Sequence, residues 1–383
     1  MSGQRRAWGW AAALRSGSTT PWQDWLNTAD PGEADPFSSY LPGAQQLGLL
    51  RRANLAAEAT GRKLPRATAD RILAAGVTGR GRGDLPVAGD GEPQRFGPRP
   101  VDPDTLPEHE FLRVAAGLIA DDIAAIEEAP PQRRGLVDRV RDARRPQEQP
   151  FVIVGVPWRA RAMSAALAAQ GLRPGGRGAT AYLLADDLGT VVADAWTARA
   201  FDQGGPTWPE FVEIFATAGR LPPRADLPRM ANAAVQRYGA AQVRVVLDPS
   251  ALAAELGVAS VPEPPRLGAN AVDLVRRVGQ PLGGMVPSEA RPRLLRAALV
   301  GRLDGRGGPA LTVPPGWETW LATQAERTHH EIAAAGYPVL GDLDRMLPGP
   351  LAADPVEPVA AEVLALALGL LLDPVRPPVK EAS

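Results

Sequence analysis

The sequence predicts an α/β fold, a parallel sheet covered by helices, with an additional all-helical N-terminal region. Short apolar runs alternate with helical segments after residue 150, which indicates parallel strands joined by helices. Before that point apolar residues recur with a period near 3.6 and no convincing strand occurs. We therefore divide the 383 residues into a helical region over 1–148, an α/β domain over 149–350, and a C-terminal helix and tail over 351–383.

The N-terminal region contains two clear amphipathic helices among loops rich in proline and glycine. One begins after Pro42 and continues through Leu55, and the other runs from Pro107 through Ile123. Residues 79–99, where glycine and arginine alternate, predict a loop. The arginine-rich residues 132–149 predict a solvated helix followed by a linker.

The α/β domain is predicted from short, continuous apolar runs, which are typical of strands buried on both faces. The predicted strands are 151–155, 179–185 and 243–247, and the predicted helices between and after them include 159–170, 187–201 and 315–335. All of the chain beyond Ser250 is expected to be helical. The apolar stretch 359–372 is about fourteen residues long and contains Glu362. Because a bilayer requires ~20 apolar residues, we expect a buried terminal helix there.

Composition excludes several classes of function. The 42 basic and 43 acidic side chains nearly cancel, so we expect neither nucleic acid nor a membrane surface as a partner. The absence of cysteine excludes disulfides, thiolate nucleophiles and cysteine-based metal sites. No signal peptide is recognisable at the N-terminus, so we expect a cytoplasmic location.

Two pairs of segments suggest a partial internal duplication. Residues 42–54 match residues 267–279 in residue type and spacing. The stretch from Trp8 to Trp22 likewise matches that from Trp196 to Trp208, with a glycine and a proline before the second tryptophan. In a chain rich in arginine, alanine and leucine, chance similarity is the alternative.

Five segments after residue 150 follow one another in an order shared with a known family. They are 154–157, 195–211, 221–226 with 243–248, 267–279 and 335–344. On these segments the chain resembles the sulfotransferase-like proteins of GC-rich bacteria, from Phe151 to about Gly349. The resemblance implies a P-loop-like sheet core that binds 3′-phosphoadenosine-5′-phosphosulfate and transfers sulfate to an alcohol or amine.

The family holds the 5′-phosphosulfate in a loop between a strand and a helix, with a lysine, a glycine and hydroxyl groups. The corresponding residues here begin Pro157, Trp158, Arg159 and, after an alanine, Arg161. Tryptophan stands in place of the lysine, and alanine in place of the flexible glycine. Arg159 and Arg161 are the candidate donor-binding cations, although they would have to build a different cradle.

The family holds the donor's 3′-phosphate with an arginine after the second strand and a serine about eight residues later. Asp186 occupies the arginine position here, and the serine position falls at or near Asp194. Two carboxylates would repel a phosphate dianion, so the standard donor is not expected to bind in the standard way. Three other interpretations remain. Asp186, Asp187 and Asp194 either cap a helix or hold a divalent metal, and Trp158 belongs to an ordinary helix start on the domain surface.

These observations leave three hypotheses for function. The first is a sulfotransferase-fold protein that lacks standard donor binding, has no cofactor, and acts as a binding or accessory protein for a protein partner or an active relative. The second is a divergent transferase that uses Arg159 and Arg161 for an anionic donor. The third is a protein-interaction module built by the helical N-terminal region. No catalytic residue and no metal ligand is assigned.

Overall fold

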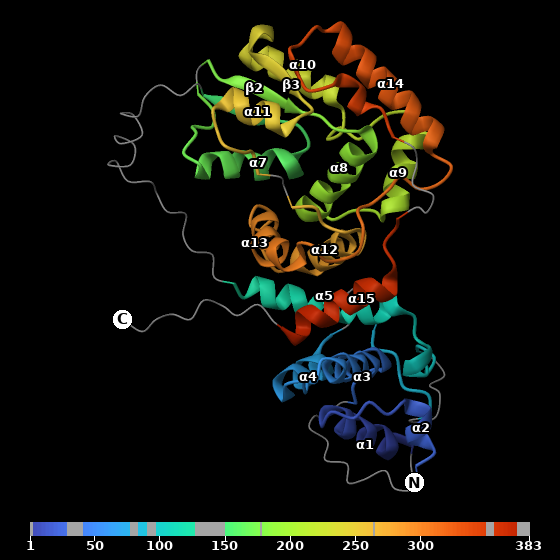
Figure 1. Cartoon of the computed structure of the whole chain (residues 1–383). Helices are drawn as coiled ribbons and strands as arrows, with labels where there is room; N and C mark the ends of the chain where they lie inside the picture. The colour runs from blue at the N-terminus through green and yellow to red at the C-terminus, as the bar shows by residue number, and fades with distance from the viewer. Residues whose placement is uncertain are drawn as a thin grey trace, which may run out of the picture. The chain divides into compact units, whose positions relative to one another are not determined.

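The chain forms two compact units, and each is assembled from separate stretches of sequence (Figure 1). The computed structural model describes residues 3–28, 41–76, 83–89, 97–126, 150–176, 178–262, 265–349 and 356–373. The first unit comprises Met1–Glu128, Asn270–Leu303 and Pro358–Ser383, and the second comprises Ala129–Ala269 and Asp304–Glu357. This division differs from the linear domains expected from the sequence. The reason is that an amphipathic pattern shows that a helix has an apolar face, but not which distant helix covers it.

The regular elements of the first unit, within its described residues, are helices and one 3-10 turn, apart from an isolated bridge between Val87 and Val101. Its helices are α1 (Gly3–Arg15), α2 (Trp22–Leu26), α3 (Ala44–Ala59), α4 (Arg66–Ala74), α5 (Glu108–Ala124), α12 (Ala269–Leu282), α13 (Arg291–Leu303) and α15 (Ala360–Leu372), with a 3-10 turn, η1, at Pro103–Thr105. The terminal helix α15 buries its apolar side chains against α5 and α3. Gly48 of α3 allows close approach of α5, because a Cβ there would lie 2.5 Å from the Phe111 ring.

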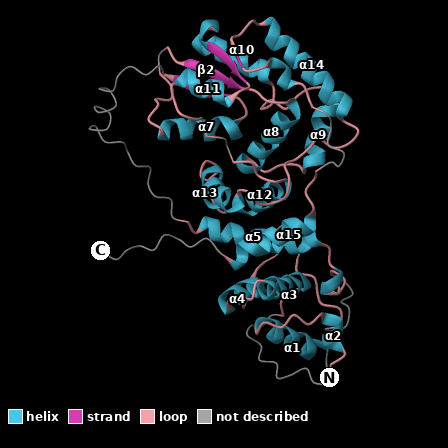
Figure 2. Ribbon diagram, in the orientation of Figure 1, coloured by secondary structure: helices cyan, strands magenta, loops and turns pink. Residues whose placement is uncertain are grey.

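The second unit contains a parallel four-stranded sheet in the order β1-β2-β3-β4, drawn in magenta where visible in Figure 2. The strands are β1 (Phe151–Val154), β2 (Thr180–Leu184), β3 (Val243–Val246) and β4 (Val339–Leu340). The first three confirm the predicted strands. The expectation that everything beyond Ser250 is helical is wrong at β4, because two residues are too few to show a strand pattern.

Helices cover both faces of this sheet. The helices of this unit are α7 (Pro157–Ala169), α8 (Leu188–Asp202), α9 (Trp208–Thr217), α10 (Leu227–Tyr238), α11 (Pro249–Leu256) and α14 (Glu318–Ala334), with 3-10 turns η2 (Ala240–Gln242) and η3 (Leu343–Met346). On one face Phe151 and Tyr182 pack with Met163 of α7 and Leu252 of α11. On the other face Ala181 and Val243 pack with Ala234 of α10. The α/β class is therefore established.

Two sequence expectations fall outside what can be compared. The predicted helix and linker at 132–149 lie outside the described residues, as does much of the predicted loop at 79–99. Within the described part of that loop, Val87 makes an isolated bridge with Val101. None of the helices in the described ranges is both long and apolar enough to cross a bilayer.

Candidate functional site

A crevice of about 140 Å³ opens at the carboxyl ends of the strands in the second unit. Arg159 enters it from the start of α7, after β1, and Asp186 from the turn after β2. Leu247 and Pro249 line it after β3. The chain after β1 continues into α7 on one face of the sheet, whereas the chain after β2 returns through α10 on the other face. In open α/β sheets, ligands bind outside the carboxyl ends of the strands.

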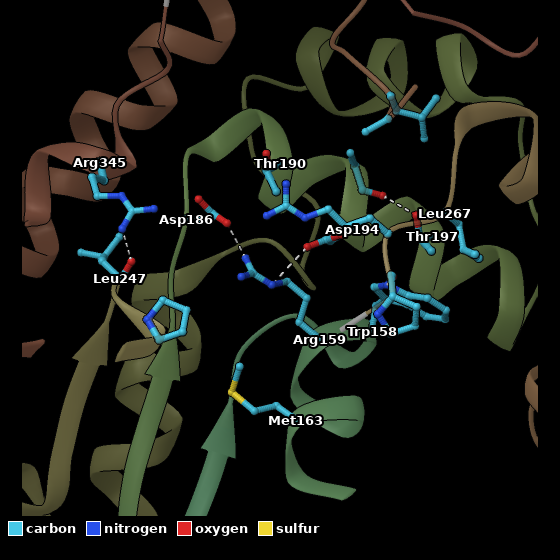
Figure 3. Close-up of a pocket in the computed structure, with 16 residues that line it drawn as sticks. Trp158, Arg159, Met163, Asp186, Thr190, Asp194, Thr197, Leu247, Leu267 and Arg345 are labelled. Carbon is cyan, nitrogen blue, oxygen red and sulfur yellow. Dashed lines mark hydrogen bonds and ion pairs between the residues drawn. The ribbon is translucent and has the colours of Figure 1, made fainter. Parts of the chain in front are cut away.

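The centre of the crevice is an arginine held by two carboxylates (Figure 3). Arg159 Nη1 donates to Asp186 Oδ2 at 2.7 Å, and Arg159 Nε lies 3.7 Å from Asp194 Oδ2. All three side chains are largely buried, with between 16% and 20% of their surface exposed. The candidate cation and the two aspartates therefore meet, as their places after β1 and β2 suggest, and Arg159 is already hydrogen-bonded to Asp186.

Asp194 carries a strongly perturbed carboxyl group. Burial raises its pKa to about 7, and the neighbouring carboxylates of Asp186 and Asp187 add to the rise. Arg159 and Arg266 act in the opposite direction. Asp194 Oδ2 is buried and accepts no hydrogen bond, which is why the neutral form is favoured. A carboxyl with this pKa can give up or accept a proton near neutral pH.

The start of α7 does not form a phosphate cradle. Only Gly155 and Val156 separate β1 from the helix, and Pro157 at its first position has no N–H to donate. Gly155 has φ +140°, and a Cβ there would lie 3.1 Å from the Leu184 carbonyl oxygen. This glycine therefore serves the close passage of β2 rather than a flexible loop.

Trp158 is a wall of the crevice and not a surface residue, so that expectation is wrong. Its side chain is 6% exposed and stacks on Phe201, with ring centroids 4.8 Å apart. The indole N–H donates to the Pro265 carbonyl at 3.2 Å. A large aromatic ring is buried here because α7 packs against α8 at this point.

Arg161 does not join Arg159. It is absent from the crevice lining and its Nη1 contacts Asp202 Oδ1 at 3.2 Å, a carboxylate that Arg224 also holds at 2.8 Å. Residues two apart on a helix point in divergent directions. The two candidate donor-binding cations therefore lie on different sides of α7.

Asp187 has a structural role. Its side chain accepts the Thr190 N–H at 3.0 Å and caps α8, as the capping interpretation expects. Within the part of the chain that the structure describes, no three histidine, aspartate or glutamate side chains are placed to hold a metal ion.

Two further cations line the crevice, and the sequence interpretation missed both. Arg266 is exposed, beside Pro265, and Arg345 lies in η3 and donates to the Leu247 carbonyl at 2.6 Å. A signal for Arg345 was present, since it follows β4 and the carboxyl ends of parallel strands share one edge. That signal required β4 to be recognised.

Taken as a donor site, the crevice does not fit 3′-phosphoadenosine-5′-phosphosulfate. Its one buried cation is paired with Asp186, the first residue of the helix after β1 is a proline with no N–H to donate, and its volume is below the ~300 to 1,000 Å³ of ligand pockets. It can hold a small polar molecule and exchange a proton with it. Comparison with known proteins found no matching family model, curated protein or solved structure.

Proposed function

We propose that this chain is a binding or accessory protein on a sulfotransferase-like α/β core, and that it does not use a phosphosulfate donor. The observation that carries the proposal is the pairing of Arg159 with Asp186 and Asp194. In this proposal the crevice keeps the position of a donor site and has lost its chemistry. A protein partner, such as an active relative, then supplies any catalysis.

Electrostatics supports the loss of donor binding. A phosphate that reaches Arg159 must displace Asp186 at 2.7 Å and remain close to both carboxylates. Each pair of like unit charges at ~5 Å costs roughly 3 kcal/mol at an effective dielectric constant near 20. A dianion facing the carboxylate of Asp186 alone meets two such terms, which exceed the worth of one charge-assisted hydrogen bond, ~1.5 to 3 kcal/mol.

Geometry argues against the divergent transferase. That hypothesis requires Arg159 and Arg161 to hold one anion together, but Arg161 is directed to Asp202 outside the crevice. The third hypothesis also needs revision. Residues 1–148 alone would lack α12, α13 and α15, and α15 covers α5, so an interaction experiment should use the full chain.

The test is a calorimetric titration of the full chain with 3′-phosphoadenosine-5′-phosphate, which carries both phosphates of the donor. We expect no binding that depends on Arg159. The comparison is between the wild type and the Arg159→Ala variant, with Arg161→Ala as a matched control outside the crevice. Low-micromolar binding that disappears in Arg159→Ala and persists in Arg161→Ala would overturn the proposal and restore a transferase.

A further inference from the structure

A second and larger cavity, of about 950 Å³, lies within the first unit. It opens between the end of α1 and the segment that joins α3 to α4. Its described lining is mostly polar and comprises Ala12, Arg15–Thr20, Asn54, Glu58, Gly61–Leu64 and Arg66. This volume falls within the range of small-molecule sites, ~300 to 1,000 Å³. Nothing in the proposed function uses it.

Positive charge is concentrated around this cavity. Arg62, Lys63 and Arg66 all line it, and none of them makes an ion pair within the described ranges. Arg15 is already neutralised by Asp70, which it contacts through Nη2 and Oδ2 at 3.0 Å.

Glu58 offsets one of the three remaining charges, so the described lining keeps two unbalanced positive charges. The whole chain is nearly neutral, with 42 basic and 43 acidic residues. The excess is therefore local to the cavity. It matches the charge of a phosphate monoester, −1.5 to −2 at neutral pH.

The loop Ser16–Thr20, which carries four hydroxyl side chains, also lines the cavity and is held in place by hydrogen bonds. The buried Asn54 amide donates to the Leu14 and Ser18 carbonyls, both at 2.8 Å. Arg51 donates to the Thr19 carbonyl at 2.8 Å. Because these carbonyl oxygens are occupied, the loop is fixed before any ligand arrives, which lowers the entropic cost of binding.

Donors remain free on this loop. Within the described residues the hydroxyls of Ser16 and Thr19 and the N–H of Thr19 make no hydrogen bond. Gly17 adopts φ +104° and closes α1, with its N–H bonded to the Leu14 carbonyl at 3.0 Å. The cavity lining thus combines hydroxyl and amide donors with guanidinium and ammonium groups, and phosphate oxygens accept from all of these.

We propose that this cavity binds a small phosphorylated molecule, a phosphate monoester or diphosphate such as a nucleotide carries, through Lys63 and Arg66 together with Ser16 and Thr19. A small molecule is favoured over a nucleic-acid backbone because the positive charge is confined to one concave site. A small ligand and a nucleic acid would bind differently in a titration. A small ligand fills the cavity once, whereas a polyanion binds with an affinity that grows with its length.

The probes are inorganic pyrophosphate, adenosine diphosphate and adenosine, titrated into the full chain by calorimetry and by thermal shift in phosphate-free buffer. We expect saturable one-to-one binding of the two phosphorylated probes and none of adenosine. The Lys63→Gln/Arg66→Gln variant should weaken binding at least about tenfold, which is the loss of ~1.4 kcal/mol or more. Both residues are exposed, so this variant is expected to fold.

The matched control is Arg5→Gln/Arg99→Gln. Both residues are exposed and belong to the first unit, and neither lines the cavity. This control lowers the net charge equally and should leave affinity unchanged. Equal weakening by both variants would overturn the proposal, since it would show binding to charge in general. So would absence of saturable binding to about 1 mM, adenosine binding as well as its diphosphate, or tighter binding with increasing oligonucleotide length.

The crevice and the cavity can be told apart with one ligand. Binding of 3′-phosphoadenosine-5′-phosphate that persists in Arg159→Ala but is lost in Lys63→Gln/Arg66→Gln supports the cavity and leaves the proposed function intact. Loss in Arg159→Ala with retention in the double variant contradicts both proposals.

Discussion

Replacing Asp194 with asparagine should stabilise the protein by an amount that grows as the pH rises from 5 to 8. The pKa of Asp194 is raised from 3.8 to about 7 in the folded chain. The folded state therefore binds this proton more tightly than the unfolded state does. Its stabilising effect is fully present below pH 3.8 and is lost as the pH rises through about 7. Asparagine keeps the shape of the neutral carboxyl and has no proton to lose.

The size of the effect follows from the same shift. Between pH 5 and pH 8 a carboxyl with these two pKa values loses about 2 to 3 kcal/mol of folding free energy. For a folding unit of ~150 to 250 residues this corresponds to roughly 4 to 12 °C in melting temperature. Arg159 keeps its contact with Asp186 at 2.7 Å in the variant, so its charge is not left unpaired.

The assay is the melting temperature of the wild type and of Asp194→Asn at several pH values from 5 to 8. We expect the advantage of the variant to grow with pH and to level off near 8. The exposed Asp304 provides the control, because Asp304→Asn should show no such trend. A constant difference across this range, or one that grows toward acid, would refute a buried Asp194 that is protonated near neutrality.

Three further substitutions test packing and charge in the first unit by urea denaturation. Gly48→Ala should cost ~1 to 3 kcal/mol, because the new Cβ would lie 2.5 Å from the Phe111 ring. Gly301→Ala, which meets no atom within 4 Å, should instead gain up to about 1 kcal/mol. Asp273→Asn should lower the free energy of unfolding by ~3 to 5 kcal/mol, because this carboxylate is only 4% exposed and pairs with Arg276 at 2.7 Å and Arg277 at 2.6 Å. An unchanged midpoint for Gly48→Ala or Asp273→Asn would contradict the packing or the ion pairs described.

The α/β class could be predicted from the sequence because its signal is local. Each of the first three strands is a continuous apolar run, and burial on both faces requires that pattern. The composition of the first unit could not be predicted. The helix α15 lies against α5 although more than two hundred residues separate them in sequence. Periodicity predicts a buried face, and only the three-dimensional structure identifies its partner.

The candidate site was predicted in its positions and not in its pairing. Arg159, Asp186 and Asp194 follow strands, so their meeting at one edge follows from a parallel sheet. From the sequence, each of these side chains was expected to attract or repel a phosphate of the donor. Their pairing with one another, Arg159 with both carboxylates, was not predicted. Arg266 lines the crevice, but no sequence pattern marks it as a site residue.

The hypothesis of internal duplication is favoured by matching contacts within each unit. Trp10 and Trp22 lie 5.1 Å apart by ring centroids, and Trp196 and Trp208 lie 5.6 Å apart. In both pairs the first indole donates to the carbonyl two residues before the second tryptophan, at 3.0 and 3.1 Å. In both, the second indole donates to a carbonyl far along the chain, at 2.9 and 2.8 Å.

Those distant acceptors extend the match. They are Ala88 and Thr312, and each also donates its own N–H to a valine carbonyl, Val101 at 2.8 Å and Val356 at 3.3 Å. A helix follows each valine, α5 in the first case and α15 in the second. If α3, α4 and α5 correspond to α12, α13 and α15, the first unit contains both sets. Its assembly from three chain segments then has a physical cause, because the equivalent helices α5 and α15 bury their apolar faces against each other.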